Sequence, residues 1–580
     1  MTFRTPTEPT GRAILLHSGA VFSGTELSID ATAVLISGEK ILAVGTDAEL
    51  RPQARLLDAE EIDLQGGLVT PGFVDAHVHA VMGGVERNAC DLTQAETAED
   101  TLGTIKQYAD SRTGAEHPAD WIIGAGWYKG NFPPGAATAE ILDAVTGERP
   151  AYLINADHHS AWVNTAALRL AGVTASTPDP EDGVIDRLPD GTPLGILHEG
   201  AMDLVGRHLP EFSTRQLAEG LLVGGEYLHS VGVTGWQEAI LGDYAGYPDA
   251  SAAYRELREL DLVPETATGA LWVPRDLTVE TVPELVEQFV LRRKENEAAG
   301  FVTRAAKLMV DGVPENRTAA MLEKYCECER LTGGSSNAGP DGRGLAYLGR
   351  EVLLAVGVAL DAAGFDLHFH AIGDRAVRWA LDTVAAVRAA NPESAARHHL
   401  AHLQIVHPED VPRFGQTGTT ANLQALWACN DAQMADQTVP LLGTERASWQ
   451  YPFRSIEAAG GRLCTGSDWP VSTPDPWQAI HVAVNRTYPQ VLDAAVAQNA
   501  PLEPREALEL ASALAAYTAG SAWQLHLDSG RGRIEAGAVA DLAVADRNPF
   551  DAVSAGHSDQ ICETRNVLTF LSGRVVYDGR

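Results

Sequence analysis

Short apolar segments alternate with helix-forming stretches through most of the chain, and this alternation limits the available folds more than any other feature. The apolar segments are typical of buried strands followed by loops: VGVTGWQEA, AAKLMVDG, FDLHFHAIGD, RHHLAHLQIV and RLCTGSDWP. Residues 281–299, 350–364 and 374–390 are rich in Ala, Leu and Glu and are expected to be helices. Such alternation favours parallel strands, and chemistry at their C-terminal ends is typical of a closed barrel. The sequence therefore predicts an α/β fold with a (β/α)8 TIM-like barrel.

The two ends of the chain have a different character. Short aliphatic stretches broken by Gly and Asp, such as AVLISGEKILAVG and NVLTFLSGRVVYDG, predict strands at both ends. We expect residues 1–72 and 525–580 to form one small β-sandwich, and residues 73–524 to form the barrel. Residues from about 85 to 215 exceed the roughly 30 residues of one barrel crossover. They are predicted to be an insertion that covers the barrel mouth.

The net charge of −35 and the isoelectric point near 4.8 exclude some classes of partner. Nucleic acids and anionic membrane surfaces both attract basic segments, so neither is an expected partner. No apolar run reaches the ~20 residues of a membrane span, and the first residues, MTFRTPTEPTGR, lack the apolar core of a signal peptide. Six cysteines, with Cys326 and Cys328 as a lone CxC, fit a reduced compartment. We therefore expect a cytoplasmic protein.

The segment His77-Val78-His79 is the sharpest chemical signal. Residues two apart on a strand point to the same side, so these imidazoles can chelate one divalent cation at the end of an apolar strand. The alternative is a pair of histidines that face solvent. The buried-type run LVTPGFVDA before them, and further histidines later in the chain, favour the metal site.

Two further clusters place histidines where predicted strands end. His370 precedes a Gly-containing loop, and His402 is the last histidine of another short strand. Barrel enzymes place their ligands at such positions, so both are predicted metal ligands. His368 points to the same side as His370 but deeper in the barrel, either in a second layer or as a hydrogen-bonded core residue. His399 and His407 are interpreted as structural or surface residues.

Asp468 and Lys307 complete the candidate ligands. Asp468 follows the predicted strand RLCT, where a carboxylate can bind metal and carry a proton from the attacking water to the leaving nitrogen. A lone Asp before Trp-Pro would otherwise be a turn residue. Lys307 lies in an apolar strand, where a lysine is costly unless it is paired or neutralised. Either it pairs with Asp311 or a neighbouring strand, or it is carbamylated by CO2 to an anion that can bridge two metals.

Together these motifs resemble the amidohydrolase superfamily, and within it the branch of N-substituted formamide deformylases and exoenzyme-regulator-like amidohydrolases. The matching segments span almost the whole chain: GFVDAHVHA, NADHHSAWVNTAAL, KLMVDGVPENRTAAM, HFHAIGDRAV, LAHLQIVHPEDV, GSDWPVSTPDPW, YTAGSAW and GRIEAGAVADLAVADRNPF. The joint match is specific for superfamily and branch, and much less so for substrate.

The resemblance implies a ligand set and a cofactor. The implied metal ligands are His77, His79, Lys307 (as a carbamate), His370, His402 and Asp468, and Asp468 is also the implied catalytic acid/base. One or two divalent cations are expected, with zinc as the default because imidazole and carboxylate ligands suit it. A homodimer is implied at the level of the family. The chain departs from many relatives after Gln424, where Trp427 follows and no histidine does.

Aromatic and polar residues of the insertion and of the strand ends are candidates for substrate contact. An aromatic lining suits an apolar or aromatic N-substituent. The alternative is that most of these side chains pack the insertion against the barrel. His158 is also a candidate for stabilising the oxyanion. The candidates are Trp127, His158, His159, Glu199, Arg317, Trp427 and Trp469.

The expected reaction is metal-dependent hydrolysis of an amide C–N bond in a small molecule, in its most specific form an N-substituted formamide. A hydrolase of cyclic amides or a deaminase is the alternative within the superfamily. A non-catalytic regulator on the same scaffold is least favoured, because every expected ligand is present. The products discriminate, since a deformylase releases formate and an amine, ring opening gives one product, and a deaminase releases ammonia.

Overall fold

The computed structural model describes residues 12–111, 121–133, 135–180, 182–244, 246–326, 339, 341–493 and 495–580. At its centre lies a sheet of eight parallel strands in the order β20-β19-β18-β17-β16-β15-β14-β7. The strands are β7 (Phe73–Val78), β14 (Val233–Leu241), β15 (Ala267–Trp272), β16 (Val302–Met309), β17 (Asp366–Ala371), β18 (His399–His402), β19 (Thr420–Leu423) and β20 (Arg462–Thr465).

The edge strands of this sheet meet where β20 ends. The Asp468 N–H donates to the carbonyl of His77, and the His79 N–H donates to the carbonyl of Trp469, both at 2.8 Å. A Cβ at Gly466 would lie 2.5 Å from the Cβ of His77, so only glycine allows this approach. The sheet is therefore a nearly closed barrel, and the predicted TIM-like α/β fold is confirmed.

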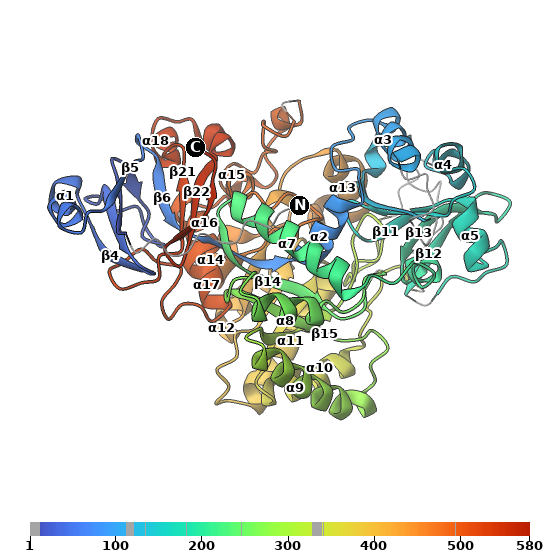
Figure 1. The fold of residues 1–580 in the computed structure, drawn as a ribbon. Helices are drawn as coiled ribbons and strands as arrows, with labels where there is room; N and C mark the ends of the chain where they lie inside the picture. Colours follow the sequence, from blue (N-terminus) through green and yellow to red (C-terminus); the bar gives the residue numbers. More distant parts are fainter. Residues whose placement is uncertain are drawn as a thin grey trace.

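Helices cover the outside of the barrel (Figure 1). They are α2 (Ala80–Asn88), α7 (Thr214–Ser230), α8 (Ser251–Glu259), α9 (Val282–Ala298), α10 (Arg350–Ala362), α11 (Asp374–Ala390), α12 (Val411–Thr417), α13 (Val439–Ala447), α14 (Phe453–Ala458), α15 (Pro476–Asn485), α16 (Leu510–Ala515) and α17 (Ser521–Gln524). Helix α11 buries Ala376, Ala380, Leu381 and Val384, which recur at helical spacing on one face. A capping box of Ser213 with Gln216 starts α7.

Both ends of the chain contribute to one β-rich unit. One sheet has the order β2-β6-β21-β22-β23 and the other β4-β3-β1-β5. The elements are β1 (Ile14–His17), β2 (Ala20–Val21), β3 (Ala33–Ser37), β4 (Lys40–Gly45), β5 (Glu60–Asp63), β6 (Leu68–Pro71), β21 (Leu542–Ala545), β22 (Asn566–Leu571), β23 (Arg574–Asp578), α1 (Asp47–Leu56) and α18 (Pro549–Ser554). Strand β21 pairs with both β6 and β22, which joins the two termini. The exact limits 1–72, 525–580 and 73–524 stay a prediction.

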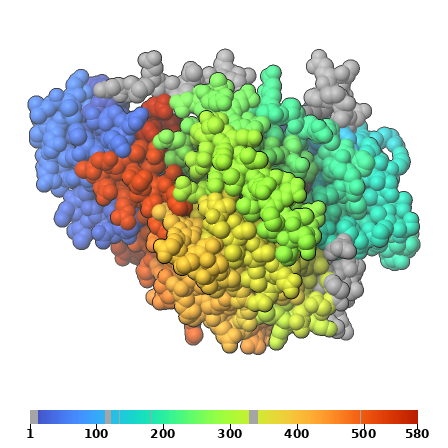
Figure 2. Space-filling model, turned by 90° about the horizontal axis from the view of Figure 1, so that it is seen from below, coloured from blue at the N-terminus to red at the C-terminus, as the bar shows by residue number. Residues whose placement is uncertain are grey.

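The chain between β7 and β14 contains a separate sheet of six strands in the order β12-β13-β11-β10-β9-β8. Its elements are β8 (Cys90–Asp91), β9 (Ile122–Trp127), β10 (Ala151–Asn155), β11 (Ser160–Val163), β12 (Gly183–Arg187), β13 (Pro193–Glu199), α3 (Ala98–Ser111), α4 (Ala139–Thr146), α5 (Thr165–Ala171) and α6 (Asp203–Gly206). We call the described residues between 90 and 206 the inserted unit. It lies at the end of the molecule opposite the terminal strands, with the barrel between them (Figures 1 and 2).

Two further observations concern the cellular setting. Across the described ranges, every helix is too short or too polar to cross a membrane. The described cysteines, Cys326 among them, form no disulfide with one another. Cys328 and the segment MTFRTPTEPT lie outside the described residues.

Candidate metal centre

The six predicted metal ligands gather at one end of the barrel, where the strands finish. His77 lies on β7 and His79 directly after it, and Asp468 follows β20. The other three lie on neighbouring strands: Lys307 on β16, His370 on β17 and His402 on β18. All six side chains are buried. Parallel strands present their C-terminal ends to one edge, which is why residues so distant in sequence meet here.

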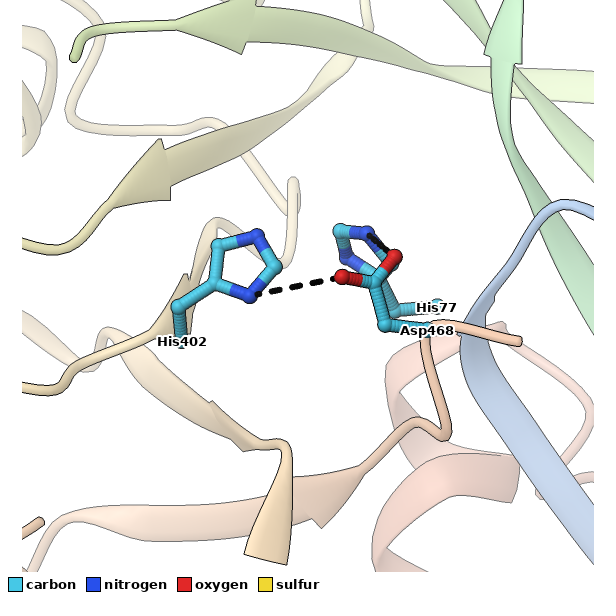
Figure 3. A group of neighbouring side chains, drawn as sticks. All are labelled: His77, His402 and Asp468. Carbon is cyan, nitrogen blue, oxygen red and sulfur yellow. Dashed lines mark ion pairs between the residues drawn. The ribbon is translucent and has the colours of Figure 1, made fainter. Parts of the chain in front are cut away.

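His77, His402 and Asp468 form the centre of this group, with potential ligand atoms within 4.8 Å of one another. Figure 3 shows the Asp468 carboxylate between the two rings. Its Oδ1 lies 3.1 Å from His77 Nε2 and its Oδ2 lies 3.9 Å from His402 Nδ1. Three such atoms converging on one point are the beginning of a cation site.

The other three predicted ligands surround this centre. His79 Nε2 lies 3.0 Å from Oδ1 of Asp468, and Lys307 Nζ lies 3.4 Å from Nε2 of His77. The ring centroid of His370 lies 4.4 Å from that of His402. The structure therefore brings all six predicted side chains into one buried cluster.

Three of the rings have a polar partner at Nδ1, the nitrogen turned away from the centre. His77 Nδ1 lies 2.8 Å from Nε2 of His368, and His370 Nδ1 lies 3.2 Å from Oδ1 of Asp311. His79 Nδ1 is 4.0 Å from Oε1 of Glu238. Metal-binding histidines commonly use one nitrogen for the ion and the other for such a partner. His368 lies behind His77, in agreement with its interpretation as a residue of a second layer.

The electrostatics of the cluster suit a cation. Burial, together with the charge of Lys307, lowers the pKa of His77 to about 3. Burial also lowers the pKa of His79 and His370, and that of His402 well below its usual value. These imidazoles are therefore neutral, which is the form that binds metals.

The carboxylate and the lysine of the cluster are shifted as well. Burial alone would raise the pKa of Asp468, but the interactions with His77 and His79 outweigh it and hold the pKa well below its usual value. Burial lowers the pKa of Lys307 to about 7, against the opposing effect of Asp468. Asp468 is thus an anion, and a sizeable fraction of Lys307 is a neutral amine near pH 7.

Two details show that this donor set fits a divalent cation. Both ring nitrogens of His402 are buried, and neither has a hydrogen-bond partner within the described ranges. Buried polar atoms without a partner are costly, and a cation would remove that cost. His402 and Asp468 also have positive φ angles of 80° and 56°, a strained conformation that clusters at functional sites.

The turn after β10 places two histidines at the barrel mouth. His158 Nε2 lies 2.9 Å from Glu86, and His159 Nδ1 lies 2.8 Å from Glu199. Burial alone would lower the pKa of both rings, but the paired carboxylates outweigh it and raise both values. The ring of His159 lies 5.8 Å from that of His370, so the inserted unit reaches the edge of the ligand cluster.

The remaining predicted substrate contacts differ in their placement. Trp427 stacks on His402 with ring centroids 5.4 Å apart and an interplanar angle of 4°. Arg317 has a φ of 56°, and no partner is found for its buried Nη2 within the described chain. It precedes Thr318, whose hydroxyl donates to Oε1 of Glu199 at 3.0 Å. Trp427 and Arg317 thus lie in the segments that follow β19 and β16, next to the ligand cluster.

For Trp127 and Trp469 the structure indicates packing instead. Trp127 is 1% exposed, packs against Trp162 and donates from Nε1 to the carbonyl of Leu153, so it belongs to the core of the inserted unit. The ring of Trp469 contacts Tyr227 and lies where a Cβ on Gly83 would come within 2.6 Å of it. It therefore fills the space between α2 and α7. The prediction that these two tryptophans line the pocket is corrected accordingly.

Sequence reasoning missed four carboxylates that support the cluster. Asp311, considered as a partner of Lys307, instead bonds to His370 and accepts the N–H groups of Ile372 and Gly373. Asp75 accepts from the Ser467 hydroxyl at 2.6 Å. The other two are Glu86 and Glu238. The sequence feature that could have identified these carboxylates is an acidic residue inside or beside an apolar run, because such a charge is buried only when it has partners.

Comparison with known proteins agrees with this geometry. The sequence pattern of the family described as "Amidohydrolase family" matches residues 60–577. Among curated proteins, LONG AFTER FAR-RED 3 of Arabidopsis thaliana is 28% identical over 99% of this chain and 94% of its own length. An N-substituted formamide deformylase of Arthrobacter pascens is 27% identical over 94% of this chain and 95% of its own. The exoenzymes regulatory protein AepA of Pectobacterium carotovorum is 28% identical over 71% and 85%.

A solved structure is also similar to this chain. An uncharacterized metal-dependent hydrolase from Pyrococcus horikoshii has a TM-score of 0.66 at 23% identity, over 93% of this chain and 98% of that one. This similarity concerns the fold. The family match and the curated relatives confirm the resemblance predicted from the motifs.

Proposed function

The chain belongs to the amidohydrolase family and is a metal-dependent hydrolase of carbon–nitrogen bonds, and on this premise we propose that its substrate is a linear amide with an apolar N-substituent. In its most specific form the substrate is an N-substituted formamide, cleaved to an amine and formate. The convergence of His77, His402 and Asp468 on one point at the strand ends supports the metal-dependent chemistry, and Trp427, stacked on His402, supports the apolar N-substituent.

The proposed centre is held by six side chains: His77, His79, Lys307, His370, His402 and Asp468. Neutral imidazoles and a carboxylate suit zinc, which we propose as the metal. A divalent cation bound there would lower the pKa of water and polarise the substrate carbonyl. Barrel packing holds all four imidazoles in place, and His77, His79 and His370 also have partners at Nδ1, so the reaction would require little reorganisation of these side chains.

Asp468 is the proposed acid/base. Its carboxylate faces the middle of the cluster, 3.0 Å from His79 Nε2 and 3.1 Å from His77 Nε2. In this role it accepts a proton from the attacking water and delivers it to the leaving nitrogen. A carboxylate whose pKa is held low is ionised at neutral pH, as the first of these transfers requires.

Lys307 is the proposed site of a carbamate. The reaction with CO2 needs a neutral amine, and burial supplies one by lowering the pKa of Lys307 to about 7. The amine adds to the carbon of CO2 and releases one proton, leaving an anionic carbamate. Its position beside His77 would let that anion bridge two cations, so we propose a binuclear centre.

The N-substituent is proposed to lie against Trp427. This ring stacks on His402 and is 5.4 Å from it, so it flanks the cluster directly. Because the side chains of Trp127 and Trp469 are packed in the protein interior, Trp427 is the main support for an apolar N-substituent. His159 and Glu199 are proposed to border the opposite side. A cytoplasmic location and a homodimer complete the proposal.

The test combines metal analysis with a product assay. Protein purified without added metal is examined by elemental analysis and assayed for formate release from N-benzylformamide. Near two zinc per chain with formate release would support the proposal, whereas one metal would argue against the Lys307 bridge. Metal without formate would redirect the search to cyclic amides and other acyl groups. No tightly bound metal, with no rescue by zinc, manganese or iron, would favour a non-catalytic binding protein.

A further inference from the structure

A row of buried polar side chains runs from His77 into the interior of the barrel. Nδ1 of His77 lies 2.8 Å from Nε2 of His368, whose Nδ1 lies 3.1 Å from the carboxamide nitrogen of Gln237. The same carboxamide nitrogen lies 3.5 Å from Nε2 of His399. Nδ1 of His399 in turn lies 2.7 Å from the carboxamide nitrogen of Gln524. All five side chains are at most 4% exposed.

Packing fixes the positions of the rings in this row. His368 and His399 are register partners on β17 and β18, and their ring centroids are 4.2 Å apart. The ring of His368 also lies 4.7 Å from that of His77. The rings therefore have little freedom to turn. What can still vary is the nitrogen that carries each proton and the end of the Gln237 carboxamide that faces the rings.

These two variables are coupled, because a neutral imidazole carries one proton and so has one donor and one acceptor nitrogen. To bind a cation through Nε2, His77 must carry its proton on Nδ1 and donate it to His368 Nε2. His368 must then donate from Nδ1, and Gln237 can accept only through its carboxamide oxygen. If the Gln237 nitrogen faces His368 instead, it donates to Nδ1 of His368, and His368 must then donate from Nε2 to Nδ1 of His77. The proton of His77 then lies on Nε2, toward Asp468.

We propose that His368, set by Gln237, is the positioning residue that decides whether Nε2 of His77 is free for a divalent cation. The inference rests on the metal centre proposed above. The orientation with the Gln237 oxygen toward the rings is the cation-binding one. His399 favours it, because Gln524 donates to Nδ1 of His399 and leaves Nε2 of that ring as the donor toward Gln237.

The first test removes the bond to His77 and then restores it. His368→Phe keeps an aromatic ring and lacks an acceptor, so the zinc dissociation constant, measured by competition with a chromogenic chelator, should rise about 10–100-fold. His368→Gln places a carboxamide oxygen within reach of Nδ1 of His77 and should bind zinc nearly as tightly as the unchanged protein. A merely structural role for the ring would leave His368→Gln as impaired as His368→Phe, which would overturn the inference.

The matched control is His398→Gln. His398 is fully buried and lies outside the row that leads to His77. Its Nε2 is 3.1 Å from Oδ1 of Asp361, and its Nδ1 accepts the N–H of Leu367. Its loss should lower the thermal unfolding temperature and leave zinc affinity unchanged. A second variant, Gln237→Glu, offers only oxygen to both rings and should retain zinc affinity, whereas Gln237→Met should weaken it.

The outcomes separate this inference from the proposed function. If the unchanged protein binds zinc and His368→Phe binds it equally well, the inference falls and the metal centre stands. Weaker binding in His398→Gln that matches His368→Phe would also overturn it, since the effect would then be general destabilisation. If the unchanged protein binds no divalent cation, the proposed centre itself fails and this inference fails with it.

Discussion

Asp468 is the residue for which we propose two roles, as a metal ligand and as the acid/base. It contacts His77 and His79 through one oxygen, and its other oxygen lies 3.9 Å from His402. Its left-handed backbone, with a φ of 56°, is held by the hydrogen bond from its N–H to the carbonyl of His77. This hydrogen bond therefore joins the end of β20, after which Asp468 lies, to β7, which carries His77, within the ligand cluster.

Replacing the carboxylate by an amide removes the proton acceptor and keeps the shape. Asp468→Asn is expected to lower kcat about 10²–10⁴-fold, the usual contribution of a positioned acid/base. Steady-state kinetics on a cleaved formamide measures this, and circular dichroism checks the fold. Asp528→Asn is the control, because Asp528 pairs with Arg397, outside the ligand cluster. Full turnover in Asp468→Asn would remove this residue from the scheme.

Lys307 predicts a pH dependence of stability. Its pKa is about 7 in the folded protein and near 10.5 when unfolded. Between these values the unfolded chain binds more protons, so the free energy of unfolding contributed by Lys307 rises with pH, by at most about 1.4 kcal/mol per unit. Below about pH 7 the full cost of burying the ammonium is present, and it disappears above the unfolded pKa.

The measurement compares Lys307→Met with the unchanged protein. Urea unfolding between pH 7 and 10, in metal-free and CO2-free buffer, should show the unchanged protein gaining stability relative to the variant as pH rises. A difference that is flat with pH would mean that the lysine is charged and paired in the fold. Labelling with carbon-13 bicarbonate at neutral pH then tests whether the same amine forms a carbamate.

The sequence predicted which side chains gather in the buried cluster better than it predicted which aromatic residues lie beside that cluster. His77 and His79 stand two apart at the end of an apolar run, a pattern with few structural explanations. Trp127 could not be assigned in the same way, because an aromatic side chain in a core and one in a pocket follow the same hydrophobic pattern. Only its enclosure against Trp162 settles the difference.

Helix α2 begins directly after His79, so the packing of this helix affects the position of His79 in the ligand cluster. It lies against α7 at glycine contacts. A Cβ on Gly84 would come within 1.8 Å of the carbonyl oxygen of Gly220, and one on Gly224 within 2.3 Å of the carbonyl oxygen of Ala80. The backbones of the two helices are therefore close enough that no side chain fits between them.

Gly84→Ala should separate these helices and disturb His79. Overpacking of this kind costs about 1–3 kcal/mol of stability, and the displaced His79 should weaken zinc binding as well. Gly103→Ala is the matched control, because nothing lies within 4 Å of a Cβ there and the residue is within α3. It should be stabilising by roughly 0.5–1 kcal/mol. Equal effects of the two changes in denaturant unfolding and zinc titration would contradict this account.

The barrel strands and the crossover helices expected at residues 281–299, 350–364 and 374–390 could be predicted at this scale, since the structure has α9, α10 and α11 there, whereas the internal fold of the inserted unit could not. The segments around Lys307, His370 and His402 read as buried strands and are β16, β17 and β18. The inserted unit was predicted as extra chain that covers the barrel mouth, without any secondary structure of its own. Its strands are neighbours in sequence order from β8 to β11, but β13 rather than β12 pairs with β11, and partner choice of that kind depends on long-range contacts.

At the scale of the molecule, the chain forms the barrel, the β-rich unit of the two termini and the inserted unit. The ligand cluster lies where the barrel meets the inserted unit. The terminal strands and the inserted unit lie on opposite sides of the barrel (Figure 1), and the ring of His159 in the inserted unit is 5.8 Å from the ring of His370 in the ligand cluster. His158 on the inserted unit has a carbonyl oxygen of Ala156 at 3.2 Å from Nδ1 and the Glu86 carboxylate at 2.9 Å from Nε2. Both neighbours are acceptors, and against the effect of burial the Glu86 carboxylate raises the pKa of His158, so the surroundings favour the cationic form of the ring.

Glu86 connects this ring to the barrel. Its Oε1 also accepts from the Tyr247 hydroxyl at 3.1 Å, so one oxygen joins α2, the inserted unit and the loop after β14. The carboxylate is buried, with 6% exposure. Removing it would leave a buried imidazolium and a buried hydroxyl without their acceptor, and each such loss costs about 1–3 kcal/mol, more for the charged group.

Glu86→Leu is therefore expected to release the inserted unit from the barrel mouth before it unfolds the molecule. Hydrogen–deuterium exchange should increase in residues 155–163 and remain unchanged in the terminal strands, and KM should rise more than kcat falls. Glu86→Gln keeps one acceptor oxygen and should show a smaller change of the same kind. Glu140→Gln, on the exposed face of α4, is the control. If exchange rises equally in the terminal strands, Glu86 supports the whole fold rather than the junction at the mouth.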